Sequence, residues 1–233
     1  MAQYLALRAA RQRRPAVLVF LDVEKAYDRL DRHRLWTTLL DTYRLPPALV
    51  GALQQMYTDL EASLKWQGGF SAPFPMTEGV RQGCPCSPLL FSLVYERIVQ
   101  AVTTTLGYRV LRRTALEIAD VALSLLLYAD DLLVCSRSIE GASRLVAGCA
   151  AFCAAEGLTI HPQKSKVLAI AVPTTTAVRL GDLPLPFVTG VRYLGLELSG
   201  APGQLTTHLA RRLQTAEAAF TGVRRLCAHL HLY

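Results

Sequence analysis

Several features are absent from this sequence of 233 residues, and each absence excludes a class of protein. No uninterrupted apolar run approaches the ~20 residues that a membrane-spanning helix needs, and the arginine-rich start has no apolar core like that of a signal peptide. The cysteine pairs Cys84-x-Cys86 and Cys149-x-x-x-Cys153 lack the spacing of a zinc site. There is no internal repeat and no long linker. We therefore expect an intracellular protein with reduced cysteines and no membrane partner.

The composition that is present favours a globular protein with a polyanionic partner. Hydrophobic residues make up 52% of the sequence, enough to bury a substantial core. The formal net charge of +7, from 25 basic and 18 acidic residues, suits nucleic acid and would make binding dependent on salt. The arginines near both ends either contact nucleic acid or lie on solvated helix faces: Arg8, Arg11, Arg13, Arg14, Arg211, Arg212, Arg224 and Arg225.

Adjacent carboxylates give the strongest chemical signal. The sequence Tyr-Ala-Asp-Asp at residues 128–131 lies between two strand-like apolar runs, 121–127 and 132–135. A desolvated charge without a partner is normally avoided, and a hard cation such as Mg²⁺ prefers carboxylate oxygens. Asp22 lies near the end of a third apolar run, 16–23, which is typical of a strand buried on both faces. Acidic residues from neighbouring strand ends are what a two-metal phosphoryl-transfer centre needs.

The pattern of apolar and turn residues predicts an alternation of helices and strands. Helices on one face of a mostly antiparallel sheet would give an α+β fold. A Ser-Pro pair at 87–88 is expected to cap one helix, and Gly157 to end another. Helices are predicted over 1–14, 32–43, 47–57, 87–106, 140–156 and 205–226. Strands are predicted over 16–22, 60–66, 121–135 as a hairpin, 166–172 and, as several short pieces, 178–199.

Five short motifs follow one another over roughly residues 16–199. They are Phe-Leu-Asp at 20–22 with Ala-Tyr-Asp at 26–28, Gly-Val-Arg-Gln-Gly-Cys-Pro-Cys-Ser-Pro-Leu-Leu-Phe at 79–91, Tyr-Ala-Asp-Asp at 128–131, Gly-Leu-Thr-Ile-His-Pro-Gln-Lys-Ser at 157–165, and Tyr-Leu-Gly-Leu-Glu-Leu at 193–198. In this order they resemble the palm motifs of reverse transcriptases. They are most similar to those of non-LTR (LINE-type) retrotransposon enzymes, with group II intron enzymes as the nearest alternative.

The resemblance implies an RNA-directed DNA polymerase, a nucleotidyltransferase that extends a primer 3′-hydroxyl with dNTPs by a two-Mg²⁺ reaction, with Mn²⁺ as an alternative ion. Asp22 and Asp130 correspond to the main metal ligands. Asp131 is expected to be auxiliary, because side chains alternate along a regular strand. The family's further ligand is the carbonyl after the first aspartate, here Val23. Lys164 corresponds to a residue proposed to protonate or neutralise pyrophosphate, although a lysine in a polar loop can also be merely solvated.

Four further residues are implied to bind the incoming nucleotide. Tyr27 corresponds to an aromatic gate that leaves no room for a 2′-hydroxyl, and its alternative is a core aromatic residue. Gln82 carries a donor and an acceptor on one amide and corresponds to a nucleotide contact. Gly83 permits close approach of the backbone. Arg81 either meets template or triphosphate or faces solvent.

The implied architecture is a reverse-transcriptase palm whose fingers and thumb are incomplete. About 15 residues precede the first catalytic strand, too few for the family's basic fingers, and one predicted helix follows the fifth motif. We therefore expect residues 1–200 to form the palm with partial fingers, and residues 201–233 to begin a thumb or connection. The chain would be a piece of a longer element.

The expected partners are an RNA template, a DNA primer, dNTPs and the rest of a parent polyprotein with fingers, thumb and endonuclease. Action in the nucleus, where target-primed synthesis takes place, is the expected location, with the cytoplasm as an alternative. Two other functions stay open at this point. The chain could be an inactive remnant that only binds nucleic acid, or a maturase polymerase of the group II intron type.

Overall fold

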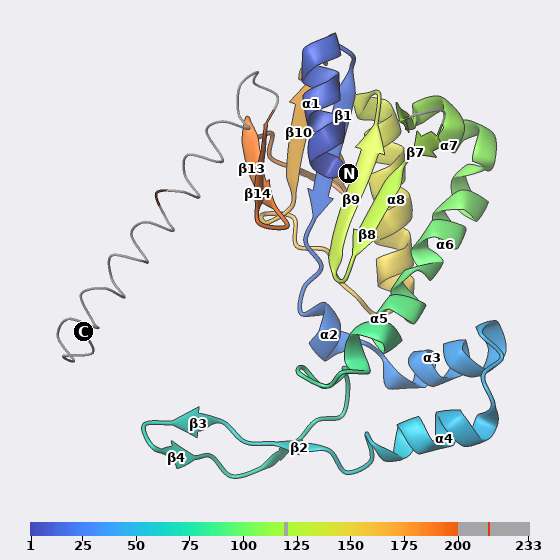
Figure 1. The fold of residues 1–233 in the computed structure, drawn as a ribbon, viewed down its shortest axis with the longest axis vertical. Coiled ribbons are helices and arrows are strands. Elements are labelled where there is room, and N and C mark those ends of the chain that lie inside the picture. Colours follow the sequence, from blue (N-terminus) through green and yellow to red (C-terminus); the bar gives the residue numbers. More distant parts are fainter. Residues whose placement is uncertain (119–120, 200–213, 215–233) are drawn as a thin grey trace, which may run out of the picture.

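A four-stranded antiparallel sheet forms the centre of the protein (Figure 1). The computed structural model describes residues 1–118, 121–199 and 214. Across the sheet the strands run in the order β10–β1–β9–β8. Every residue of β1 is buried, as its continuous apolar sequence predicts for a strand that has neighbours on both edges and covers on both faces. The strands are β1 (Ala16–Leu21), β8 (Leu125–Tyr128), β9 (Asp131–Ser136) and β10 (Lys166–Ile170).

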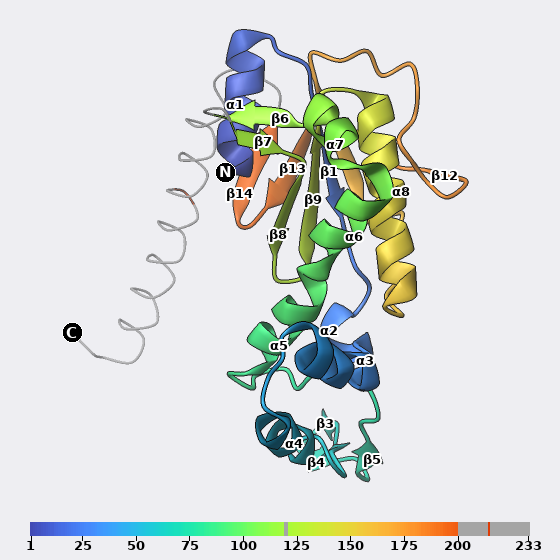
Figure 2. The same cartoon turned by 90° about the vertical axis from the view of Figure 1, so that its right-hand side faces the viewer.

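The two faces of the sheet are covered by different elements (Figure 2). Because side chains alternate along a strand, Val17 and Val19 enter a core with helices α5, α6 and α8, whereas Leu18 and Phe20 enter a core with α1 and the β13–β14 hairpin. Most helices of the α+β fold therefore lie on one face, and α1 covers part of the other. These covering elements are α1 (Ala2–Gln12), α5 (Ser87–Tyr95), α6 (Arg97–Leu106), α8 (Ile139–Ala155), β13 (Gly190–Tyr193) and β14 (Leu196–Ser199).

Four short helices follow the first strand and form the lower part of the molecule in Figure 1. The Asp31 carboxylate accepts hydrogen bonds from the backbone N–H groups of His33 and Arg34, which caps α3. A proline near the first turn begins α4, as the sequence predicts. These elements are α2 (Ala26–Arg29), α3 (Arg32–Thr37), the π-helix η1 (Thr38–Thr42) and α4 (Pro47–Gln55).

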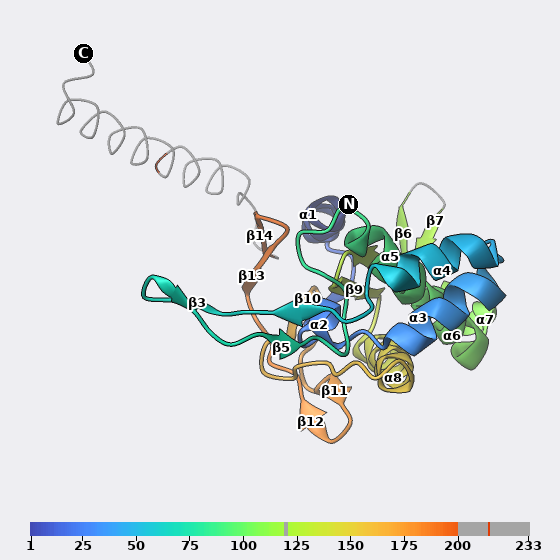
Figure 3. The same ribbon diagram turned by 90° about the horizontal axis from the view of Figure 1, so that it is seen from below.

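A narrow two-stranded arm extends from this lower part (Figure 3). The prediction of one strand over 60–66 is wrong. The regular pairing is interrupted between Ala62 and Lys65, where the Leu64 backbone N–H donates to the side-chain oxygen of Ser71. Gln67 and Gly68, both with positive φ, make the two-residue turn at the tip. The arm consists of β2 (Glu61–Ala62) paired with β5 (Phe74–Pro75), and β3 (Lys65–Trp66) paired with β4 (Gly69–Phe70).

The helix predicted over 87–106 is also corrected, because it divides at Glu96 into α5 and α6. The Tyr43 hydroxyl lies 2.7 Å from the Leu93 carbonyl oxygen, which would otherwise accept the N–H of Arg97 in a continuous helix, and it also contacts the Glu96 carboxylate. The cap position before α5 belongs to Cys86 rather than Ser87. A distant tyrosine thus ends the helix at a point that no local residue pattern marks.

The remaining elements are small, except for α8, which agrees with its prediction. Ser138 caps α8 by accepting from the Gly141 N–H, and Gly157 follows its end with φ +73°. The hairpin predicted over 121–135 begins only at β8, since β7 pairs with β6 instead. The predicted helix over 205–226 lies outside the described residues except for residue 214. The other elements are α7 (Tyr108–Thr114), β6 (Leu116–Ile118), β7 (Val121–Leu123), β11 (Arg179–Leu180) and β12 (Leu183–Pro184).

No helix among the described residues is both long and apolar enough to cross a membrane.

Candidate active site

The Tyr-Ala-Asp-Asp motif forms the turn between β8 and β9. Tyr128 pairs with Asp131, so only Ala129 and Asp130 lie within the turn. Ala129 has a φ of +52°, a left-handed conformation that costs a non-glycine residue about 1–2 kcal/mol. The paired strands on either side, with Leu132 and Leu133 buried, hold the turn in this form. The motif is therefore presented at one end of the sheet.

The register of the sheet aligns the first motif with this turn. β1 and β9 pair from Val17 with Ser136 to Leu21 with Leu132. One further step in the same register sets Asp22 opposite Asp131. Directly opposed residues of antiparallel strands share a face of the sheet, with Cα atoms about 4.5–5.5 Å apart. Asp22 and Asp131, which are more than a hundred residues apart in the sequence, thus lie at the same end of the sheet.

The backbone after Asp22 is held on its other side by the fourth motif. The Asp22 carbonyl accepts the His161 N–H at 2.7 Å, the Glu24 N–H donates to Thr159 at 2.8 Å, and Val23 bridges Ile160. Because successive carbonyls of an extended chain point to opposite sides, the Val23 carbonyl is directed away from this segment and toward the side of β9.

Ser165 anchors the same joint and was not singled out from the sequence. The Asp22 N–H donates to the Ser165 hydroxyl oxygen at 3.1 Å, and that hydroxyl donates to the His161 carbonyl at 2.9 Å. Ser165 is buried, so the joint is protected from water. Its only sequence signal is its place at the end of the fourth motif.

The three carboxylates influence one another electrostatically. The pKa of Asp131 is raised above its ordinary value, first by burial, then by the charge of Asp130 and then by that of Asp22. The pKa of Tyr27 is raised by burial and then by Asp130. Within residues 1–118 and 121–199, no three His, Cys, Asp or Glu side chains are grouped closely enough to hold a metal as they stand. The carboxylates thus share one negative region without forming a preassembled chelate.

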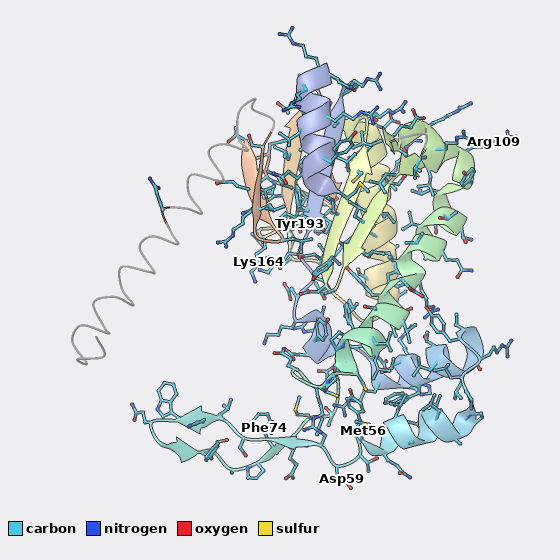
Figure 4. The ribbon with its side chains drawn as sticks, viewed as in Figure 1. Met56, Asp59, Phe74, Arg109, Lys164 and Tyr193 are labelled. Carbon is cyan, nitrogen blue, oxygen red and sulfur yellow. The ribbon has the colours of Figure 1, made fainter. Side chains whose placement is uncertain are left out.

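Two further side chains border this region. The Lys164 ammonium nitrogen is 4.0 Å from an Asp22 carboxylate oxygen, and both side chains are substantially exposed, so the pair contributes at most about 1 kcal/mol. Tyr193 contacts Phe20 with ring centroids 5.2 Å apart. Burial, then the charges of Asp131 and Cys135, raise the pKa of Tyr193 to about 12. Figure 4 labels Lys164 and Tyr193 beside the lower part of the β13–β14 hairpin.

Tyr27 is fixed by the core rather than left free in solvent. Its ring stacks on Phe91 with centroids 4.6 Å apart and an interplanar angle of 17°. Phe91 is fully buried in α5 and contacts Tyr95 in turn. The half-buried Tyr27 ring therefore has a defined plane.

The second motif is tied to the segment that carries Tyr27. The Gln82 amide nitrogen donates to the Asp28 carboxylate at 2.9 Å, and the Val80 N–H donates to the Tyr27 carbonyl at 2.7 Å. Gly79 is required here: it has φ +78°, and an added Cβ would lie 2.4 Å from the Asp28 carbonyl oxygen. Arg81 and Gly83 are exposed, and Gly83 has open space around it. No role was assigned to Asp28 from the sequence.

Arg32 holds the loop that leads into this motif, and sequence reasoning did not identify it. Its guanidinium donates to the carbonyls of Met76, Glu78 and Gly79 at 2.7–3.1 Å and more weakly to that of Tyr57 at 3.4 Å. The guanidinium also lies 5.0 Å from the centre of the Tyr57 ring. Burial lowers the pKa of Arg32. No local pattern indicates this role, because all four acceptors are backbone atoms far along the chain.

Known sequences that resemble this chain come from transposable elements. The 149 kDa protein of transposon TX1 from Xenopus laevis is 34% identical over 185 residues, which are 77% of this chain and 13% of that protein. The Pol polyprotein of R2DM from Drosophila melanogaster is 29% identical over 151 residues, 65% and 13% of the two chains. The probable RNA-directed DNA polymerase from transposon BS of the same fly is 27% identical over 191 residues, 77% and 20% of the two chains. The chain therefore spans only 13–20% of the length of these relatives.

Solved structures with a similar fold include two telomerases. Apo telomerase from Candida tropicalis, truncated from its C-terminal domain, superposes with a TM-score of 0.57 at 14% identity, covering 84% of this chain and 37% of that one. Telomerase from Candida albicans with a fragment of telomeric RNA gives 0.57 at 13% identity, covering 85% and 32%. At such identities the likeness shows the fold alone, a palm-like α+β arrangement. Residues 3–198 match the family model described as reverse transcriptase (RNA-dependent DNA polymerase), and the chain belongs to that family.

Proposed function

We propose that this chain is the catalytic palm of an RNA-directed DNA polymerase that extends a primer 3′-hydroxyl with dNTPs. The observation that supports the proposal is the pairing of β1 with β9 as far as Leu21 and Leu132, which one further step would extend to Asp22 and Asp131, next to the turn that holds Asp130. Carboxylates from two adjacent strand ends are the arrangement that nucleotidyl transfer requires.

The donor set fits hard divalent cations. Members of the family generally use divalent metal ions, and we propose two Mg²⁺, with Mn²⁺ as a substitute, because all donors are oxygens. Asp22, Asp130, Asp131 and the Val23 carbonyl would hold them. Such ions activate an attacking oxygen and stabilise a leaving one. The raised pKa of Asp131 supports this choice, since neighbouring negative charges are what a bound cation would neutralise.

The other site residues would receive and orient the nucleotide. Tyr27, with its plane set by Phe91, would lie under the sugar and exclude a 2′-hydroxyl. Gln82 would contact the nucleotide through its amide oxygen, because its amide nitrogen is already directed at Asp28. Gly83 would allow close backbone approach, and Arg81 would meet the triphosphate or template. Lys164, beside Asp22, would donate a proton or positive charge to pyrophosphate.

The partners and arrangement of the parent protein belong to the same proposal. Members of this family act on RNA templates, and relatives here are Pol polyproteins. We propose that residues 1–200 act as palm with partial fingers and that residues 201–233 begin a thumb or connection. A DNA primer, fingers, thumb and endonuclease would come from outside these residues, and synthesis on chromosomal DNA would take place in the nucleus.

Primer extension tests the proposal directly. The purified chain is incubated with a DNA primer annealed to an RNA template, dNTPs and either Mg²⁺ or EDTA. Incorporation with Mg²⁺ is expected for the wild type and for Asp182→Asn, an exposed carboxylate in the β11–β12 turn. It should be lost in Asp22→Asn and Asp130→Asn. If these two variants incorporated dNTPs as well as the wild type, the proposed site would be wrong.

A metal-binding measurement separates a failed site from an inactive remnant. Mn²⁺ binding, followed by electron paramagnetic resonance, should be weakened by Asp22→Asn and Asp130→Asn and unchanged by Asp182→Asn. Metal binding without any nucleotide incorporation by the wild type would favour a remnant that keeps the fold. Absence of both would contradict the proposed role of the carboxylates.

A further inference from the structure

Arginines gather at the end of the sheet opposite to the carboxylates. We call this group the basic end. The C-terminal part of α1, the helix α7 and the end of β9 converge there: the Arg137 N–H donates to the Thr114 carbonyl at the end of α7, and Arg8, Arg14 and Arg137 line a common cavity of about 280 Å³. All except the half-buried Arg8 are exposed. The basic end consists of Arg8, Arg11, Arg13, Arg14, Arg109, Arg112, Arg113 and Arg137.

The basic end carries the net charge of the chain. Two acidic side chains are described beside these segments: Glu117 of β6, paired with Arg137 at 2.8 Å, and Glu140 in the first turn of α8, paired with Arg144. Because Arg144 balances Glu140, the eight arginines against Glu117 leave an excess of seven positive charges, equal to the formal net charge of +7 for the whole sequence. Residues 1–21 contain no Asp or Glu. The rest of the molecule is therefore balanced in charge, and this end is not.

Neighbouring charges do not explain the cluster. Elsewhere Arg29, Arg34 and Arg144 pair with carboxylates, whereas seven of the eight arginines of the basic end form no ion pair within residues 1–118 and 121–199. Helix dipoles favour Arg11, Arg112 and Arg113 at helix C-termini, but Arg109 stands in the first turn of α7, where a cation is disfavoured. Like charges held this close repel one another, so a polyanion would stabilise the arrangement.

This surface is separate from the proposed active site. β1 connects the two: Arg14 lies two residues before its first residue, and Asp22 directly follows its last. Six residues at about 3.3 Å each place the two ends ~20 Å apart, well beyond a Debye length of about 8–10 Å. Figure 4 shows the separation, with Arg109 at the upper end and Lys164 near the lower end of the sheet.

We propose that the basic end is a second nucleic-acid surface, which binds the phosphate groups of a folded nucleic acid away from the proposed active site. Arginine suits this partner because its planar guanidinium forms two parallel hydrogen bonds with a phosphate. All eight cations are arginines, although the chain also has four lysines, all elsewhere. The alternative partner, an acidic protein segment, is an outcome of the test.

The test measures binding in EDTA, so that it does not depend on the proposed catalysis. The full chain is titrated with a fluorescent RNA hairpin, a DNA hairpin of the same sequence, and a poly-glutamate peptide, at salt concentrations between about 50 and 200 mM. The test variant is Arg14→Ala/Arg113→Ala. The control, Arg34→Ala/Arg179→Ala, removes the same charge from exposed positions outside the basic end. Circular dichroism verifies that both remain folded.

The expected result is a change in salt dependence. Each lost phosphate contact lowers the slope of log K against log salt by about 0.9, so the slope of the test variant should be smaller by about 2 units. Between about 50 and 200 mM salt, the fold-loss of affinity should therefore be about tenfold smaller in the test variant than in the wild type. The control should match the wild type. A change with the RNA hairpin alone assigns the surface to RNA, and a change with both hairpins assigns it to phosphate backbones in general. An unchanged slope, or binding of poly-glutamate in preference to both hairpins, would overturn the proposal.

Discussion

The two ends of β1 and β9 carry opposite charge and use their side chains differently. At one end Asp22, Asp130 and Asp131 lie in one region. Strand pairing, a strained turn and backbone hydrogen bonds to residues 159–161 fix the backbone there. At the opposite end of the sheet, most arginines of the basic end are exposed to solvent and have no ion-pair partner among the described residues. The carboxylates are thus held by the fold, while the arginines are left to be ordered by whatever binds them.

The two ends meet different requirements: fixed geometry for the carboxylates and high charge density for the arginines. A site that transfers a nucleotidyl group must hold its groups within a fraction of an ångström, and buried strands such as β1 supply that rigidity. A surface that captures a polyanion needs charge density and reach, which exposed arginines supply without fixed geometry. We therefore expect single substitutions to be severe at the carboxylate end and graded at the basic end.

The largest expected contrast is in the reaction itself. Asp131→Asn should lower the rate of primer extension by at least about 100-fold, as removal of one charge-stabilising group commonly does. Arg14→Ala/Arg113→Ala should act mainly through the template concentration needed for half-maximal rate, and more strongly at high salt. Steady-state kinetics at two salt concentrations measure both effects. Comparable losses of turnover in the two variants would contradict the expected difference between the two ends.

Next in size is the effect of adding one methyl group beside the nucleotide loop. Gly79→Ala should destabilise the protein by about 3 kcal/mol or more, because the new Cβ would lie 2.4 Å from a backbone oxygen. Gly68→Ala, at the tip of the arm, has a similar positive φ but nothing within 4 Å. It should cost only about 1 kcal/mol. Urea unfolding of both variants compares them, and equal values would show that the close approach of Gly79 to Asp28 is unimportant.

Arginines should also differ between the two regions in their contribution to stability. Arg32→Ala removes the hydrogen bonds to four carbonyls and should lower the free energy of unfolding by about 2–3 kcal/mol. Arg113→Ala, in the basic end, should change it by less than about 0.5 kcal/mol. Thermal and urea unfolding provide the measurement. A stable Arg32→Ala protein would mean that the loop before Gly79 is held by other contacts.

The sequence was informative where one local pattern determines the structure. The buried strand β1, the turn at 128–131 and helix α8 follow from a continuous apolar run, from paired aspartates between apolar segments and from a capped amphipathic stretch. The family motifs also predicted the palm-like fold. The division of the helix at Glu96 and the interrupted strand at Leu64 could not be predicted, because Tyr43 and Ser71 act across the chain.

For the site, residue types were accessible from the sequence but their relations were not. The motifs selected Asp22 and Asp131, yet only the strand register shows which residues face each other. Arg32 and Asp28 were missed because their importance lies in contacts with backbone carbonyls and with Gln82, which have no periodic signature. The roles assigned to the site residues stay predictions until the variants are measured.

The smallest predicted effect is a titration that reports the charge at the carboxylate end. The Tyr193 phenol has its pKa raised to about 12, first by burial and then by Asp131. Asp131→Asn removes the second cause, so phenolate should form at lower pH, although burial keeps the pKa above the ordinary value of about 10. Tyrosinate absorbance in EDTA, with Tyr193→Phe to identify the signal, measures the shift.

The same titration makes a prediction for stability, and its sign follows from the raised pKa. A phenol that ionises later in the folded than in the unfolded state contributes stability below about pH 10. That contribution is lost as the pH rises through about 12. In Asp131→Asn the loss should still begin near pH 10 but should be smaller and complete at a lower pH, whereas Asp182→Asn should follow the wild type. Identical alkaline profiles for all three proteins would show that Asp131 does not influence Tyr193, and that the negative region does not extend to the β13–β14 hairpin.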